Sequence, residues 1–164
     1  MVPMTVERVS IGEGFGGTLD TLTLMRQLAR EGSRMPDIRQ GALNCIWLQP
    51  ARFDLHEVRA IFEFVRDHIR YVRDPLHFES VATPSQTLLM KCGDCDDKST
   101  LLAAMLESVG YPNRFVVTGY HDAQPEHVYL QVFANGEWIN ADATEKMPLG
   151  YAPPMPVFTH VERI

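Results

Sequence analysis

The chain has 164 residues, of which 45% are hydrophobic and 22% are charged, and its formal net charge is −6. This length and composition are typical of one globular domain that can bury a sizeable core. The negative charge argues against a nucleic-acid partner, which would require a basic face. No apolar stretch is long enough for a membrane span, and the N-terminus lacks the features of a secretory signal. Three cysteines cannot all pair within one chain, so we expect a cytoplasmic protein.

Helices are predicted in the first two thirds of the chain and strands after them. Apolar spacing, capping residues and Pro or Gly stops indicate helices over residues 18–32, 36–48, 53–72, 83–90 and 95–109. Residues 1–17 and the proline-rich tail from Met147 are expected to be irregular. Helices followed by strands indicate the α+β class. We expect a single domain over 1–164, divided into a helical part at about 18–70, a core at about 71–146 and a tail at 147–164.

The stretch KCGDCDDKSTLLAAM, residues 91–105, holds two of the three cysteines. Asp94 is a suitable N-cap and Asp97 stands three residues later, which places Cys95 at the first position of a helix. A helix N-terminus lowers the pKa of a thiol, whereas the neighbouring aspartates raise it, so we expect a base to help hold the thiolate. Because Cys95 belongs to the apolar stripe of this helix, its thiol should point toward the sheet that follows.

A hairpin is predicted by Asn135-Gly136, a strong signal for a two-residue type I′ turn. With this turn, the alternation of side chains makes His127 and Asp142 diagonal neighbours on one face of the two strands. Diagonal neighbours lie about 7–8 Å apart at the backbone, which an imidazole and a carboxylate can bridge with a hydrogen bond. A nucleophile, a base and a group that orients the base are the parts of thiol catalysis. Cys95, His127 and Asp142 are therefore the candidate catalytic residues.

These residues lie in three segments, IRYVRD, GDCDDKSTLLAAMLESVGYPNRFVV and EHVYLQVFANGEWINADAT, between about residues 60 and 144. Together the segments resemble the transglutaminase-like superfamily, and the cysteine, histidine and aspartate motifs of that family fall on Cys95, His127 and Asp142. The resemblance implies a papain-like fold and thiol chemistry on an amide bond of a peptide or protein, by hydrolysis or by acyl transfer. We expect no cofactor and no metal. The segment GTLDTLTLMRQLAREG is similar to the leader of short bacterial and phage-encoded members.

Three other interpretations remain open at this point. A zinc site would combine Cys92 and Cys95 with two histidines such as His121 and His127, although no second C-x-x-C accompanies the first. A thioredoxin-type pair normally follows a strand in a βαβ unit, whereas we expect a loop or short helix before Cys92. A catalytically inert binding module on the same fold is the third, and the intact set of three catalytic candidates argues against it.

Several groups are candidates for the hydrogen-bond donors that would stabilise an oxyanion. The backbone N–H of Cys95 is one candidate, because it lies at a helix start. Gln86 is a side-chain candidate, but it also fits as the third residue of a capping box that begins at Thr83. Tyr71 is a further candidate. Trp138 shares the hairpin face with the catalytic candidates, and we expect it either to wall the cleft or to pack there without a role.

Overall fold

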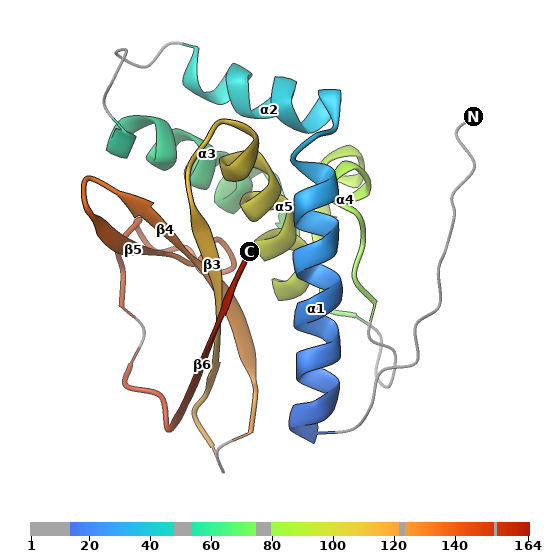
Figure 1. Ribbon diagram of the computed structural model, residues 1–164, viewed down its shortest axis with the longest axis vertical. Coiled ribbons are helices and arrows are strands. Elements are labelled where there is room, and N and C mark those ends of the chain that lie inside the picture. The colour runs from blue at the N-terminus through green and yellow to red at the C-terminus, as the bar shows by residue number, and fades with distance from the viewer. Residues whose placement is uncertain (1–13, 48–53, 75–79, 122–123, 153) are drawn as a thin grey trace.

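The computed structural model describes residues 14–47, 54–74, 80–121, 124–152 and 154–164. Helices pack on one side of an antiparallel sheet, which confirms the predicted α+β class (Figure 1). The helices are α1 (Gly14–Gly32), α2 (Pro36–Ile46), α3 (Asp54–His68), α4 (Pro84–Met90) and α5 (Cys95–Ser108). The strands are β1 (Arg70–Tyr71), β2 (Cys92–Gly93), β3 (Asn113–Gly119), β4 (His127–Ala134), β5 (Glu137–Ala141) and β6 (Phe158–Arg163). No helix in these ranges is long and apolar enough to cross a membrane.

Helix α5 lies in the middle of the molecule, between the sheet and the other helices (Figure 1). Most of its residues are buried, because apolar side chains occupy nearly every position from Leu101 to Leu106. These side chains share one core with Val128, Leu130 and Val132 of β4 and with residues of α1, α2 and α3. The helix that begins at Cys95 is thus packed from several sides, which fixes the place of its first turn.

The hairpin formed by β4 and β5 has the predicted two-residue turn. Asn135 and Gly136 both have positive φ angles, 52° and 86°, as a type I′ turn requires. The strand pairing runs from Ala134↔Glu137 to Leu130↔Ala141. The predicted register is therefore confirmed, and with it the separation of an apolar face toward α5 from a mixed face on the other side.

The tail from Met147 is not irregular throughout, so that expectation is wrong. Residues 158–163 form β6, which pairs antiparallel with β3 and completes a sheet of the order β5-β4-β3-β6. Arg26 Nη1 lies 2.8 Å from Glu162 Oε1 and joins this edge of the sheet to α1. The strand was missed because prolines precede it and its partner is distant in the sequence, so no local pattern indicates the pairing.

Two further differences concern the segments around the candidate cysteine. Helix α1 begins at Gly14 rather than at residue 18, because packing of its later turns on α5 overrides the low helix propensity of glycine. Helix α3 ends at His68, and the residues after it form the short parallel pair of β1 and β2, with Tyr71 opposite Gly93. This pair, which the sequence did not indicate, holds Tyr71 beside the segment that leads into Cys95.

Candidate active site

Cys95 is the first residue of α5, as predicted. The Asp94 carboxylate accepts hydrogen bonds from the backbone N–H groups of Asp96 and Asp97, at 3.0 and 3.2 Å. The Asp97 carboxylate accepts the N–H of Asp94 at 3.4 Å, which completes a capping box. The other oxygen of Asp97 accepts the N–H of Ala82 at 2.7 Å. The cap therefore defines the start of the helix and holds the loop before α4 against it.

His127, the first residue of β4, meets the carboxylate of Asp142 just beyond β5. His127 Nε2 lies 2.7 Å from Asp142 Oδ2. This is the diagonal contact that the hairpin register predicts. The imidazole is held at one nitrogen, so its Nδ1 is left for another partner.

Thr144 is a supporting residue whose role we did not predict from the sequence. Its backbone N–H and its hydroxyl both donate to Asp142 Oδ1, at 3.0 and 2.5 Å, and its Oγ1 lies 3.4 Å from His127 Nε2. The signal was present as Asp-Ala-Thr, because an aspartate commonly accepts the N–H of the second residue after it. Thr144 thus fixes the carboxylate that fixes the imidazole.

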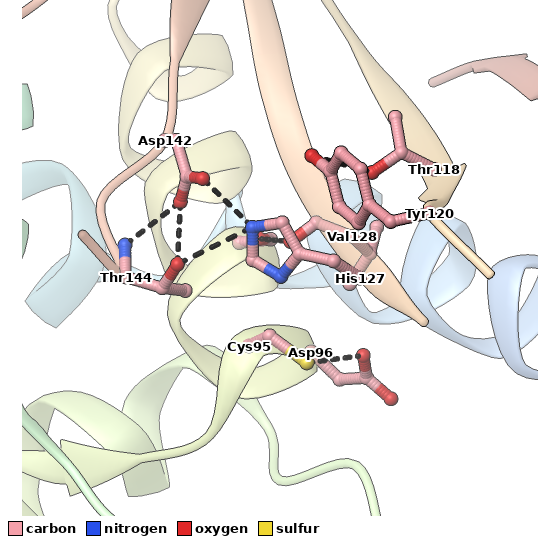
Figure 2. A network of polar contacts seen from close by, with 9 residues as sticks. Cys95, Asp96, Thr118, Tyr120, His127, Val128, Asp142 and Thr144 are labelled. Atoms are coloured by element: carbon pink, nitrogen blue, oxygen red, sulfur yellow. Dashed lines mark hydrogen bonds and ion pairs between the residues drawn. The ribbon is translucent and has the colours of Figure 1, made fainter. Parts of the chain in front are cut away.

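The thiol of Cys95 and the free ring nitrogen of His127 face each other across the gap between α5 and β4 (Figure 2). Both residues line one hollow, which we call the α1 hollow because Thr18, Thr21, Leu22 and Met25 of α1 form part of its wall. The second turn of α5 is tied to β4 here, since Ser99 Oγ donates to the carbonyl of Val128 at 3.3 Å. The fold therefore brings the helix start and the strand start together at an accessible surface.

The surroundings of Cys95 disfavour ionisation of its thiol. Burial raises the pKa of the thiol far above its ordinary value, and the charges of Asp96 and Asp94 raise it further. The nearer carboxylate is close, with Asp96 Oδ1 3.4 Å from Sγ. A hydrogen bond with the backbone of Val128 lowers the pKa but does not compensate. A thiolate here therefore requires a cation beside it.

The environments of His127 and Asp142 shift their pKa values so that the imidazole can be that cation. Burial disfavours the charged imidazole, but the hydrogen bond and the charge of Asp142 outweigh it and raise the pKa of His127. Burial likewise disfavours the charged Asp142, yet the hydrogen bond and charge of His127 and the two bonds from Thr144 lower the pKa of this carboxyl. Both shifts favour the same state, an imidazolium bonded to a carboxylate.

Gln86 and Tyr71 have different surroundings. Gln86 Oε1 accepts the N–H and the hydroxyl of Thr83, both at 3.1 Å, so it closes the capping box of α4. It does not line the α1 hollow. Tyr71 lies in β1 next to β2 and is 44% exposed; burial and then the charge of Cys95 raise the pKa of its phenol. Of the two, Tyr71 is the one near the thiol.

Trp138 does not wall the cleft. It pairs with Phe133 at the tip of the hairpin, where the two ring centroids are 5.4 Å apart, and the guanidinium carbon of Arg114 lies 4.1 Å from the centroid of its ring. Phe133 follows His127 by six residues of strand, which corresponds to about 20 Å. Trp138 shares a face of the hairpin with the candidate catalytic residues, but this distance along the strand places it away from the site.

The four residues of the alternative zinc site are not gathered around one point. In the described part of the chain, the only group with three metal-ligating atoms within 4.8 Å of one another is Asp94, Cys95 and Asp96. His121 instead lies against Glu126, with Nδ1 3.0 Å from Oε2. Cys92 lies in β2 and, like the other two cysteines, is a free thiol.

Solved structures share this fold. Calcium-bound LapG of Legionella pneumophila matches with a TM-score of 0.55 and 20% identity, over 87% of each chain. A candidate protease of Parabacteroides distasonis matches with a TM-score of 0.62 and 14% identity, over 78% of this chain and 26% of that one. At these identities the likeness shows the fold alone, and it agrees with the expected papain-like core.

Sequence comparisons extend beyond the fold. Dynein regulatory complex subunit 7 of Chlamydomonas reinhardtii is 38% identical over 82 residues, which are 46% of this chain but only 7% of that protein. The family model of the transglutaminase-like superfamily matches residues 48–143, more than half of the chain, and this range includes Cys95, His127 and Asp142. The chain therefore belongs to the transglutaminase-like superfamily.

Proposed function

We propose that this protein is a thiol enzyme that attacks an amide bond of a peptide or protein. Cys95 acts as the nucleophile, His127 as the general base and acid, and Asp142 as the group that orients and charges the imidazole. The observation that carries the proposal is the alignment of the three groups, in which the thiol faces Nδ1 while Nε2 lies 2.7 Å from the carboxylate. Membership of the transglutaminase-like superfamily supports the same chemistry.

The first half of the reaction forms a thioester. The Cys95 thiol gives its proton to His127 Nδ1, and the resulting thiolate attacks the amide carbonyl carbon. The imidazolium, stabilised by Asp142, then gives that proton to the departing amine as the C–N bond breaks. The raised pKa of His127 favours holding the proton between these two steps.

The second half releases the acyl group. Water or a primary amine attacks the thioester carbonyl, and His127 accepts the proton of this nucleophile. As the C–S bond breaks, His127 gives that proton to the departing sulfur, which restores the thiol and the neutral imidazole. Water gives an acid and makes the protein a peptidase or amidase, whereas an amine gives a new amide and makes it an acyltransferase. Hydrolysis is the outcome that we favour, since the Parabacteroides protein that shares this fold is described as a protease.

Two donors are suited to the negative oxygen of the tetrahedral intermediate. The cap of α5 uses the N–H groups of Asp96 and Asp97, so it leaves the N–H of Cys95 at the helix start for the substrate. The Tyr71 hydroxyl is the second, because β1 holds it beside the segment that leads into Cys95. Replacing Tyr71 by Phe tests this role, and the loss of one such donor typically lowers kcat by about 10²–10³.

Intact-mass analysis with peptide and glutamine-amide substrates, with and without an added primary amine, tests the proposal. Hydrolysis and acyl transfer give products of different mass, and Cys95→Ser should give neither. Cys92→Ser is the matched control and should keep turnover. A protein that binds peptides but changes none of them, and whose Cys95 is not alkylated faster than Cys45, would instead be the inert binding module.

The assay is run both with calcium and with EGTA. LapG has been solved in calcium-bound and EGTA-treated forms, and Asp94 and Asp96 flank Cys95 in this chain. Carboxylates are ligands that calcium prefers, but two of them are fewer than the six to eight oxygens that it takes. Comparing the two conditions shows whether an ion changes the charge beside the thiol.

A further inference from the structure

A second hollow borders the candidate active site on the side of Asp142 and Thr144. It has a volume of about 760 Å³ and lies between the end of α3, strand β1 and the segment after β5. We call it the basic hollow, because its lining includes the cationic side chains Arg66, Arg70, Lys98 and Lys146. Such a concentration of positive charge is unexpected in a chain with a net charge of −6.

Only part of this positive charge is compensated. Arg66 is paired with Asp67 through two hydrogen bonds of 2.7 Å, and Asp67 is the only acidic residue that lines the hollow in the described part of the chain. Arg70 and Lys146 are exposed, and neither forms an ion pair with another described residue. The rim therefore carries two cations that are open to an anionic ligand.

Lys98 adds a third cation at the floor of the hollow. The residue is 2% exposed, and Nζ donates to the carbonyls of Ile69 at 2.5 Å and Arg66 at 3.3 Å. An ammonium has three N–H donors, so these two bonds leave one. Burial lowers the pKa of Lys98 to about 8, although Asp67 and Asp142 act in the opposite direction. An anion in the hollow would stabilise the charged form of this lysine.

The basic hollow adjoins the candidate catalytic residues through Tyr71 and Thr144. Tyr71, which lines it, pairs with Gly93 two residues before Cys95. Thr144, which also lines it, is bonded to Asp142 and lies 3.4 Å from His127 Nε2. An extended molecule whose amide carbonyl lies at Cys95 would therefore have the basic hollow within reach, past Tyr71.

The opposite side of the site has the opposite charge. The α1 hollow is lined by Asp94, Asp96 and Glu126. Among the described residues, no lysine or arginine lines it. Thr144 and Asp96 lie on opposite sides of the line from Cys95 to His127 (Figure 2). The charge of the surface thus changes sign across the reacting groups.

We infer that the basic hollow binds a carboxylate of the substrate, so that an acidic group is preferred on one side of the scissile amide and disfavoured on the other. The inference rests on the proposed function, because it places the carboxylate on the molecule whose amide is attacked. The carboxylate has two sources, an Asp or Glu side chain or the free C-terminus of a peptide. Electrostatic complementarity of this kind selects a substrate and sets its direction in the cleft.

Binding is measured first, in the Cys95→Ser protein, so that it does not depend on turnover. Peptides of one sequence carry Glu, Gln or Lys at each position in turn, with either a free or an amidated C-terminus. Their affinities are determined by titration of the ¹⁵N-labelled protein, in which the amides of Arg70, Tyr71 and Lys146 report on the basic hollow. Glu should bind about five- to tenfold more tightly than Gln at one group of neighbouring positions, and less so at high salt.

The double substitution Arg70→Gln and Lys146→Gln should reduce this ratio toward one. The matched control is Arg30→Gln with Arg34→Gln, which removes the same charge from exposed positions near the end of α1 and should leave the ratio unchanged. A preference for the free over the amidated C-terminus identifies the terminal carboxylate as the source, and a preference for internal Glu identifies the side chain.

Equal binding of Glu and Gln peptides, or a Glu preference that survives the double substitution, would overturn the inference. Preferential binding of Glu peptides by a protein that turns over none of them would uphold the inference and count against the proposed function. The experiment therefore distinguishes a failure of the inference from a failure of the proposed function.

Discussion

Cys95 is a thiol whose immediate neighbours oppose its ionisation. Burial, Asp96 and Asp94 together raise its pKa. The residue that can reverse this is His127, whose pKa Asp142 raises against the effect of burial. Reactivity at this position therefore depends on an ion pair between two residues rather than on the cysteine alone.

Removing the nearer carboxylate should make Cys95 more reactive. In Asp96→Asn the charge 3.4 Å from Sγ is lost, which lowers the pKa of the thiol and raises the rate of iodoacetamide alkylation at neutral pH by roughly three- to tenfold. The rate is measured by peptide mapping after brief labelling across a range of pH. Asp37→Asn, at an exposed position in the first turn of α2, is the control. An Asp96→Asn profile that coincides with it would show that Asp96 does not govern the thiol.

Removing the charge of Asp142 should have the opposite effect. Asp142→Asn keeps the size of the side chain but withdraws the charge that raises the pKa of His127, so the imidazolium no longer stabilises the thiolate. The apparent pKa of the thiol should rise, and turnover should fall by up to about 10⁴-fold if the aspartate matters as it does in serine triads. Identical alkylation profiles and activities in the two proteins would show that the carboxylate has no such role.

Thermal melts of Asp142→Asn at several pH values test the same pair through stability. The lowered pKa of Asp142 means that its charge stabilises the fold above the ordinary carboxyl range and that this effect is lost as the pH falls through the lowered pKa. The raised pKa of His127 means that its charge stabilises the fold below the ordinary imidazole range and that this effect is lost as the pH rises. The difference in Tm from wild type should be largest at about pH 4–6.5, between the two ordinary values, and should shrink on both sides.

At the scale of elements, local sequence signals were sufficient to predict the structure wherever a turn or a helix cap determines the geometry. Asn135-Gly136 determines the register of the hairpin, and this register brings His127 to Asp142. The Asp94 cap determines that Cys95 begins α5. The sequence was not sufficient where two distant segments meet, as in the pairing of β1 with β2, nor for the balance of charge and burial at Cys95, which depends on how completely β4 covers the thiol.

The junction of β2 and α5 can be tested by adding one methyl group. A Cβ at Gly93 would lie 2.5 Å from Asp97 Cβ and 2.8 Å from Asp97 Oδ2, so Gly93→Ala should displace the residue that closes the capping box. We expect a loss of about 1–3 kcal/mol in the free energy of unfolding, together with slower alkylation of Cys95. Both are measured by denaturant unfolding and peptide mapping.

Gly16→Ala is the matched control for Gly93→Ala. A Cβ at Gly16 meets nothing within 4 Å, and alanine is the better helix former, so this variant should be stabilised by up to about 1 kcal/mol. If Gly93→Ala were as stable and as reactive as wild type, the close approach of Gly93 to Asp97 would not be what sets the position of Cys95.

At the scale of the whole molecule, the candidate catalytic residues lie at one edge of the sheet, and β6, which we expect to stabilise the fold, lies at the opposite edge. The candidate catalytic residues use β4 and the end of β5, whereas β6 lies at the other edge beyond β3. β6 covers one side of β3 through a full set of paired residues and is joined to α1 by Arg26 and Glu162. A pairing between segments so far apart in the chain is decided by the assembled core, which is why the tail could not be predicted from its own residues.

A variant truncated before residue 156 tests the stability of the fold separately from the reactivity of Cys95. Removing β6 exposes the hydrogen-bonding edge of β3 and deletes Phe158 and Ile164, which pack against the core. The free energy of unfolding should therefore fall by about 3 kcal/mol and Tm by roughly 6–12 °C. Arg26→Gln is the control for the ion pair alone, and because both side chains are partly exposed it should lower stability by no more than about 0.5 kcal/mol. Below its melting range the truncated protein should still alkylate Cys95 at the wild-type rate, since β3, β4 and α5 remain. Unchanged stability would mean that the edge pairing contributes nothing, and loss of thiol reactivity in a folded truncated protein would mean that β6 shapes the site through β3.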